Sequence, residues 1–359
     1  MRRTTVTLLM SFTLASTVAC SQPESKTQPT TVISASVSHV GDPVGGDGNS
    51  NSGIVLSAFE WDNYSKPQDV SAYVSNWKDK LSRAASDHRL SSNAEGQFAG
   101  LEQQSKGLWS ACPEAPEVLG TLTHVCHHGN STSKRELVLL GDSHAMMMLP
   151  LVESILDHND WTVTFLGQAA CPASDNDPKQ ENDADPQACK LHREATWAYV
   201  QDHRPDLVVV SDATGAQVVE GGLSQGDYLS GLRTSLSNLR GSGTKVMLFT
   251  LTPFYPHPAA CVTKGLDITK CSADLNGDNG SLSFRNVRSL NAATAEVATS
   301  AGANVLDFSK FLCTELECPG VIDGSFVTSD GGHFTREILE KLAPMVADEF
   351  RRIGVENLH

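Results

Sequence analysis

Short apolar segments alternate with helical patterns from residue 136 to the C-terminus, and this alternation constrains the fold more than any other feature. The segments are continuously apolar, so they predict strands buried on both faces. Such strands separated by helices indicate a mostly parallel sheet covered on both sides, which is a three-layer α/β/α fold with about five parallel strands. The predicted strands are residues 136–141, 162–166, 206–211, 244–251 and 303–308.

The N-terminus has the pattern of an export signal. Residues 1–19 contain two arginines, an apolar stretch and small residues before Cys20, which favours a cleaved signal peptide over a membrane span. The segment resembles a bacterial lipoprotein signal, which implies that Cys20 carries a lipid anchor on the extracytoplasmic face of the cell membrane. Plain secretion is the alternative. Residues 20–53 are rich in Ser, Thr, Pro, Gly and Asn and predict a flexible tether.

The cysteine count agrees with export to an oxidising compartment. The chain has nine cysteines, and Cys20 is the odd one in the lipoprotein interpretation. The other eight fall into successive close pairs, each closing a loop between predicted elements, although many connectivities are open. No Cys-x-x-Cys spacing occurs, so we expect no metal site. The predicted disulfides are Cys112–Cys126, Cys171–Cys189, Cys261–Cys271 and Cys313–Cys318.

The charge of the chain excludes one class of partner. Lys and Arg number 27 against 42 Asp and Glu, for a formal net charge of −15. An acidic chain without a basic run makes a poor ligand for a phosphate backbone, so we expect no nucleic-acid binding.

Residues 54–111 predict a small helical extension in front of the α/β region. Between Val70 and Ala99 the sequence is amphipathic, with apolar residues at helical spacing that include Val74, Trp77 and Leu81. We expect this helical segment to pack on the main domain, residues 112–359.

Two motifs carry the candidate chemistry. Gly141-Asp142-Ser143-His144 follows the first predicted strand, where a tight turn exposes the Ser143 hydroxyl near the positive end of a helix. Asp330 and His333, in the segment SDGGHFT, precede the last predicted helix. A serine becomes a nucleophile with a histidine base, and a carboxylate orients that histidine. In parallel sheets, functional groups gather beyond the carboxyl ends of the strands.

These segments resemble the SGNH (GDSL-type) hydrolase-like domain at the C-terminus of extracytoplasmic acyltransferase-3 proteins, which modify surface glycans. The resemblance covers roughly residues 112–350 and implies a flavodoxin-like SGNH-hydrolase fold. It implies that Ser143 is the nucleophile, His333 the general base and Asp330 its orienting partner. The segments that carry it are LVLLGDSHAMMMLPLVE, Ala170-Cys171-Pro172, PDLVVVS, the Pro253–Cys261 loop and CTELECP before SDGGHFT.

The sequence departs from the family pattern at the oxyanion hole. Many SGNH enzymes supply an Asn after the third strand, where this chain has Ser211-Asp212-Ala213-Thr214-Gly215. We therefore expect the oxyanion donors among the amides of Ser143 and Gly167 and the hydroxyls of Ser211 and Thr214. Losing one donor costs about 3 kcal/mol of transition-state stabilisation.

The sequence thus predicts an exported serine esterase or O-acyltransferase that acts on acyl, most simply acetyl, esters of a cell-envelope glycan or glycolipid. It needs no cofactor, and a membrane acyltransferase that supplies acyl groups is the partner that the resemblance implies. One alternative is a catalytically weak or inactive glycan-binding or envelope-assembly lipoprotein on the same scaffold. Another is action on a lipid ester at the anchoring membrane.

Two groups of residues near these motifs receive structural interpretations. The histidines around Cys126, at positions 124, 127 and 128, predict an exposed loop beside a disulfide. The methionines at positions 146 to 148 predict filling of the space between a helix and the sheet.

Overall fold

The computed structural model describes residues 69–87, 89–90, 92–110, 123–179, 184–241, 243–262, 268–277 and 282–359, with the single residues 67 and 112. The predicted signal peptide, the Cys20 anchor, the tether and residues 54–66 of the extension lie outside the described residues. Within the described part of the chain, no helix is both long and apolar enough to cross a membrane.

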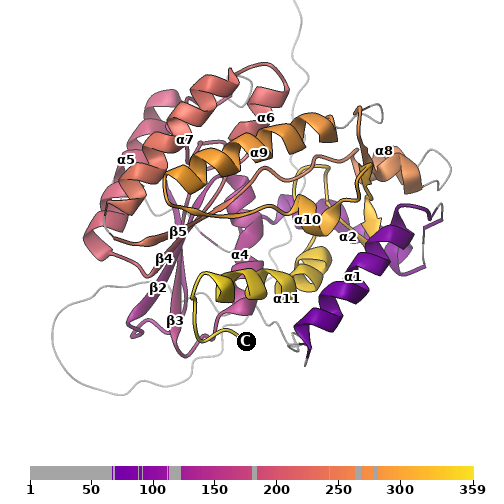
Figure 1. The fold of residues 1–359 in the computed structure, drawn as a ribbon, viewed down its shortest axis with the longest axis horizontal. Coiled ribbons are helices and arrows are strands. Elements are labelled where there is room, and N and C mark those ends of the chain that lie inside the picture. Colours follow the sequence, from indigo (N-terminus) through magenta and orange to yellow (C-terminus); the bar gives the residue numbers. More distant parts are fainter. Residues whose placement is uncertain are drawn as a thin grey trace, which may run out of the picture. The chain divides into compact units, whose positions relative to one another are not determined.

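A six-stranded sheet in the order β1-β3-β2-β4-β5-β7 forms the centre of the fold (Figure 1). Every neighbouring pair is parallel except β1 and β3 at one edge, which are antiparallel. The five predicted strands are present. The strands are β1 (His124–Gly129), β2 (Arg135–Gly141), β3 (Trp161–Gly167), β4 (Leu207–Ser211), β5 (Lys245–Phe249) and β7 (Asn304–Leu306).

The edge strand β1 corrects the prediction of an exposed histidine loop. His127 is exposed on this strand, whereas His128 is buried. The strand alternates between buried and exposed residues and contains few apolar ones. It therefore lacks the continuous apolar run by which the other strands were predicted.

Helices cover both faces of the sheet, as the alternating pattern predicted. One layer contains α4 and α11, and the other contains α5, α7 and α9 (Figure 1). Successive residues of β2 point into different layers: Leu137 and Leu139 join the α4–α11 core, while Val138 and Leu140 join the other. The helices are α4 (Ser143–Ile155), α5 (Pro186–His203), α6 (Thr214–Val219), α7 (Gln225–Arg240), α9 (Phe284–Ser300) and α11 (Arg336–Arg352).

Short elements between β5 and α11 build a smaller layer at one end of the molecule. Two short antiparallel pairs, β6 with β8 and β9 with β10, lie in this region. The segment that contains Asp330 and His333 follows β10 directly. These elements are α8 (Pro258–Val262), a 3-10 helix (Ile268–Cys271), β6 (Ala273–Asp274), α10 (Ser309–Leu312), β8 (Glu317–Cys318), β9 (Val321–Ile322) and β10 (Ser325–Phe326).

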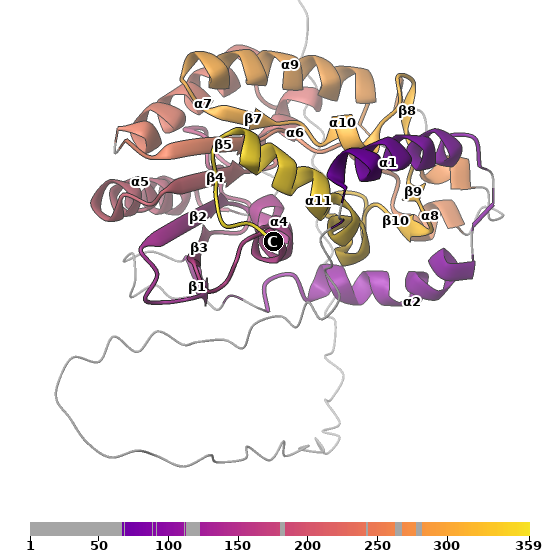
Figure 2. The same cartoon turned by 60° about the horizontal axis from the view of Figure 1, so that its bottom comes forward.

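The predicted extension contains two helices, α1 (Val70–Ala84) and α2 (Ser92–Lys106), in place of one continuous pattern. Both helices flank the β9–β10 hairpin (Figure 2). In α1, Trp77 is buried, and its indole N–H donates a hydrogen bond to the Phe311 carbonyl at 2.7 Å. The extension therefore packs on the sheet-containing part of the chain.

Four disulfides connect the described cysteines in the nearest-neighbour pairing that the sequence favoured. Their Cα–Cα distances, 4.0 to 5.1 Å, lie within or close to the usual range for disulfides. The bonds are Cys112–Cys126, Cys171–Cys189, Cys261–Cys271 and Cys313–Cys318.

Candidate functional site

Ser143 is the first residue of α4, directly beyond the carboxyl end of the central strand β2. The turn needs glycine at position 141, because a Cβ there would lie 1.8 Å from the carbonyl oxygen of Ser211 on β4. Asp142 caps α4: one carboxylate oxygen accepts the His144 N–H at 2.8 Å, and the other accepts the Ala213 N–H at 2.9 Å. The turn is thus tied to the neighbouring strand end.

Asp330 and His333 lie in a tight loop between β10 and α11. The loop is closed by a hydrogen bond from the Ser329 N–H to the His333 carbonyl at 2.8 Å. Gly331 has φ +102°, and a Cβ there would lie 2.6 Å from the Tyr255 carbonyl oxygen, so this position also requires glycine. Immediately after the loop, the Thr335 side chain caps α11.

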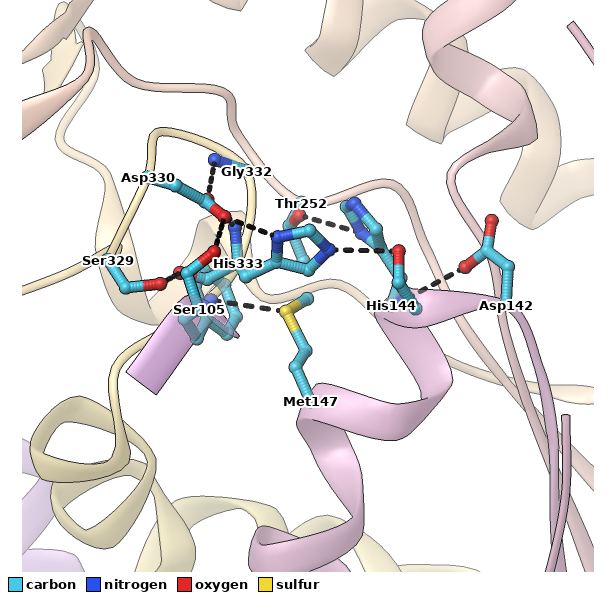
Figure 3. Close-up of polar contacts among 11 residues, drawn as sticks. Ser105, Asp142, His144, Met147, Thr252, Ser329, Asp330, Gly332 and His333 are labelled. Atoms are coloured by element: carbon cyan, nitrogen blue, oxygen red, sulfur yellow. Dashed lines mark hydrogen bonds and ion pairs between the residues drawn. The ribbon is translucent and has the colours of Figure 1, made fainter. Parts of the chain in front are cut away.

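The two motifs meet although Ser143 and His333 are 190 positions apart. His333 Nε2 lies 2.8 Å from Ser143 Oγ, and His333 Nδ1 lies 2.8 Å from Asp330 Oδ2 (Figure 3). The side chains of His333 and Asp330 are 24% and 23% exposed, so the site is partly buried and remains accessible to solvent. A serine, a histidine and a carboxylate in this order are the components of a nucleophilic triad.

The Asp330 carboxylate is held by four hydrogen bonds. Its Oδ1 accepts the N–H groups of Gly332 at 3.0 Å and His333 at 2.9 Å. Its Oδ2 accepts His333 Nδ1 and also the hydroxyl of Ser105, a residue of α2, at 2.6 Å (Figure 3). Burial acts to raise the pKa of Asp330, but these donors and the His333 charge outweigh it and hold that pKa well below its usual range.

His144, next to the serine in sequence, lies beside this hydrogen-bonded chain. Its ring centroid is 5.4 Å from that of His333 and 5.8 Å from that of Phe254. The side chain is buried, and its Nδ1 lies 3.5 Å from the Thr252 hydroxyl. Burial, together with the charge of His333, lowers the pKa of His144 to about 3, so the imidazole is neutral near pH 7.

The sequence motifs assigned no role to His144 and did not include Ser105. The position of His144 beside the nucleophile in the motif was a usable signal, since a residue at the start of α4 must lie near the site. Ser105 gave no such signal, because 225 positions separate it from Asp330.

The predicted oxyanion donors lie around the same strand ends. Gly167 and Ser211 end β3 and β4, and both lie opposite Gly141 in the sheet register. Thr214 begins α6 and is buried, and its hydroxyl has no hydrogen-bond partner. No hydrogen bond joins Ser143 to these three residues, so their role as donors stays a prediction.

Asp212 lies in the segment where many SGNH enzymes have their Asn, and it holds the backbone around it. One of its oxygens accepts the N–H groups of Ala173 at 3.0 Å and Ser174 at 3.1 Å, and the other accepts the Thr214 N–H at 3.0 Å. Burial and the nearby Asp212 charge raise the pKa of Asp142. A carboxylate that is an acceptor in all these bonds is not a donor to an oxyanion.

One cluster of possible metal ligands occurs among the described residues, Cys112, Cys126 and His128. The two cysteines form a disulfide, and His128 Nδ1 lies 2.6 Å from a carboxylate oxygen of Glu153 in α4. Both members of this ion pair are buried. The ligands are therefore engaged in structural contacts, and the arrangement does not fit a metal centre.

Comparisons with known structures return similar proteins at low identity. A Salmonella ser. Paratyphi A lipopolysaccharide acetyltransferase periplasmic domain is 13% identical, with a TM-score of 0.47, and the match covers 82% of this chain and 99% of that one. Est24, a carbohydrate acetylesterase from Sinorhizobium meliloti, is 14% identical (TM-score 0.39; 61% and 100% covered). The native M. smegmatis aryl esterase is 16% identical (TM-score 0.39; 61% and 99% covered).

A comparison of the sequence with curated proteins found no match. The family model of the SGNH domain (fused to AT3 domains) matches residues 111–348, which is well over half of the chain. The protein therefore belongs to this SGNH domain family.

Proposed function

We propose that this protein is a serine esterase or O-acyltransferase whose nucleophile is Ser143. The observation that carries the proposal is the continuous chain of hydrogen bonds from Ser143 Oγ through the His333 imidazole to Asp330, with both distances at 2.8 Å. A hydroxyl already bonded to an oriented base is the arrangement that acyl transfer through a covalent intermediate requires.

The proposed reaction has two halves. In the first, His333 Nε2 takes the Ser143 proton as Oγ attacks the ester carbonyl, and the same proton then passes to the leaving alcohol. In the second, His333 takes a proton from water or a sugar hydroxyl, which attacks the acyl carbon. The bond from that carbon to Ser143 Oγ then breaks, the acid or the new ester leaves, and His333 returns the proton to Oγ. Asp330 accepts the Nδ1–H throughout, which keeps the Nε2 lone pair directed at the serine and stabilises the imidazolium.

The developing oxyanion needs donors on the opposite side of the carbonyl from His333. The Ser143 amide lies at the N-terminus of the 13-residue helix α4, where unpaired N–H groups and the helix dipole favour negative charge. We assign the remaining donors to the predicted set, the Gly167 amide and the hydroxyls of Ser211 and Thr214.

The substrate class follows from family membership rather than from the triad. SGNH domains fused to AT3 domains suggest an acyl group on carbohydrate, so we propose acetyl esters of a cell-envelope glycan, with a membrane acyltransferase as a candidate donor of acyl groups. Four disulfides in a chain of this size support an oxidising, extracytoplasmic location. We also propose that a lipid on Cys20 attaches the protein to the cell membrane.

Asp212 favours a second candidate, a glycan-binding protein with little or no catalysis. The segment after β4 offers an acceptor where many SGNH enzymes have a donor. Removal of one oxyanion donor costs about 3 kcal/mol of transition-state stabilisation, or more than a hundredfold in rate.

Hydrolysis of p-nitrophenyl acetate separates the two candidates. The full chain with its disulfides formed is compared with Ser143→Ala and with Ser82→Ala, which changes an exposed serine of α1. We expect Ser143→Ala to abolish hydrolysis and labelling by a fluorophosphonate probe, while Ser82→Ala retains both. Equal rates in the wild type and Ser143→Ala, without labelling, would favour the binding protein. Adding oligosaccharide acceptors and weighing the products then distinguishes transfer from hydrolysis.

A further inference from the structure

Helix α2 contacts the Asp330–His333 loop and the start of α11 through two consecutive polar residues. The Ser105 hydroxyl donates to Asp330 Oδ2 at 2.6 Å. The Gln104 side chain accepts the Arg336 N–H at 3.1 Å and donates to the Glu337 carboxylate at 3.1 and 3.2 Å. Together the two residues hold the loop's aspartate and the first turn of α11, the elements on either side of His333.

Apolar packing and a backbone contact fix α2 in this position. Leu101 is buried, and the Phe98 ring lies 6.1 Å from the Phe326 ring on β10. The Gln97 side chain also donates to the Gly324 carbonyl at 3.3 Å. Because β10 leads directly into the loop, the helix and the loop are anchored on the same hairpin, and the Ser105 contact is part of a larger interface.

The Ser105 hydroxyl shares one carboxylate oxygen with the histidine. Asp330 Oδ1 accepts only backbone N–H groups, whereas Oδ2 accepts Ser105 and His333 Nδ1. A second donor on Oδ2 limits rotation of the carboxylate and occupies the lone pair that does not face the imidazole. A hydrogen bond to a charged group is worth more than a neutral one, so its loss is measurable.

We propose that α2 belongs to the active site and that Ser105 is a positioning residue, which orients the Asp330 carboxylate toward His333. This inference rests on the proposed function of the triad. The family model begins at residue 111, so the match to the family does not include α2. The contacts of Ser105 thus give the helical extension a function.

The test compares Ser105→Ala, Ser105→Thr and the control Ser82→Ala in the full chain, with p-nitrophenyl acetate as substrate. We expect kcat to fall about tenfold in Ser105→Ala with KM within twofold, because Ser105 donates to Asp330 and in this proposal acts on the reaction only through that residue. Ser105→Thr keeps the hydroxyl and restores kcat to within about threefold. Thermal unfolding of each variant shows that the fold is retained.

A second readout does not depend on turnover. The His333 Nδ1 proton bonded to a carboxylate gives a downfield proton NMR resonance, which is assigned by its disappearance in Asp330→Asn. We expect Ser105→Ala to shift or broaden this resonance and Ser105→Thr to restore it, with Ser82→Ala unchanged. The resonance thus reports the orientation of the pair directly.

The outcomes separate this inference from the proposed function. If Ser105→Ala leaves kcat and the resonance unchanged in an active protein, the positioning function is refuted. Equal losses in Ser105→Ala and Ser105→Thr also refute it, because the hydroxyl is then not responsible. If the wild type is no faster than Ser143→Ala, the esterase proposal fails, and a resonance that still depends on the Ser105 hydroxyl shows that the orienting contact exists without catalysis.

Discussion

Asp330→Asn tests the triad by changing a single atom. Two backbone N–H groups, from Gly332 and His333, point at Oδ1, so the asparagine oxygen must occupy that position. Its NH₂ group then takes the place of Oδ2 and faces His333 Nδ1, 2.8 Å away in the wild type. An NH₂ donor there stabilises the tautomer with the proton on Nε2, in which the imidazole cannot accept the Ser143 proton.

The expected loss in kcat/KM is about 10⁴-fold, or about 5.5 kcal/mol of transition-state stabilisation, as for the equivalent change in other serine triads. The Ser105 hydroxyl adapts by accepting from the new NH₂ group, so folding is retained. Steady-state hydrolysis of p-nitrophenyl acetate measures the loss. The control is Asp323→Asn, which removes ion pairs with Lys80 and Lys341 and leaves the rate unchanged. Activity of Asp330→Asn within tenfold of the wild type would refute the tautomer argument.

Two further predictions concern stability. Gly331→Ala should lower the unfolding free energy by about 1–3 kcal/mol and also lower the activity, because φ is +102° and the new Cβ would meet the Tyr255 carbonyl. The control Gly243→Ala, at φ +83° in open space, measures the cost of the backbone conformation alone. Equal losses of stability in both variants would show that the Tyr255 contact is not responsible. The second prediction uses His192→Gln, which retains a hydrogen-bond partner for the Thr123 hydroxyl. Burial, with the Arg193 charge, lowers the pKa of His192 to about 4, so protonation favours the unfolded state as pH falls below about 6.5. Urea titrations should therefore show the wild type losing about 2 kcal/mol more than the variant from about pH 7 to pH 5, whereas equal losses would show that His192 is not the group that titrates.

The central sheet was predictable because its strands carry their own signal. Within residues 136–141 and 206–211, successive apolar side chains point alternately into the two helical layers. Strands β2 and β4 end where the predictions placed them. Strand β1 was missed because its histidines interrupt the apolar run. Its burial depends on neighbours that local sequence does not encode, including the Glu153 carboxylate that lies 2.6 Å from His128 Nδ1.

The contact between Ser143 and His333 was predictable from the sheet and not from distance along the chain. Parallel strands place their carboxyl ends at one edge, so a serine after β2 and a histidine before the last helix converge there. The Asp330–His333 spacing then needs only a tight loop. The topology of the sheet therefore predicts that Ser143 and His333 lie close together, although they are far apart along the chain.

The same rule does not predict the position of Ser105, because α2 lies in the N-terminal extension and does not connect strands of the sheet. The face of α2 that carries Leu101 predicts burial, but which loop its serine meets depends on how the helix docks on β10. The docking position depends on side-chain packing such as that of Phe98 on Phe326. Hydrophobic periodicity in the sequence does not predict which side chains pack together. The proposed triad thus has a serine and a histidine that follow from topology, and an aspartate that accepts a hydrogen bond from a helix outside the family's matched residues.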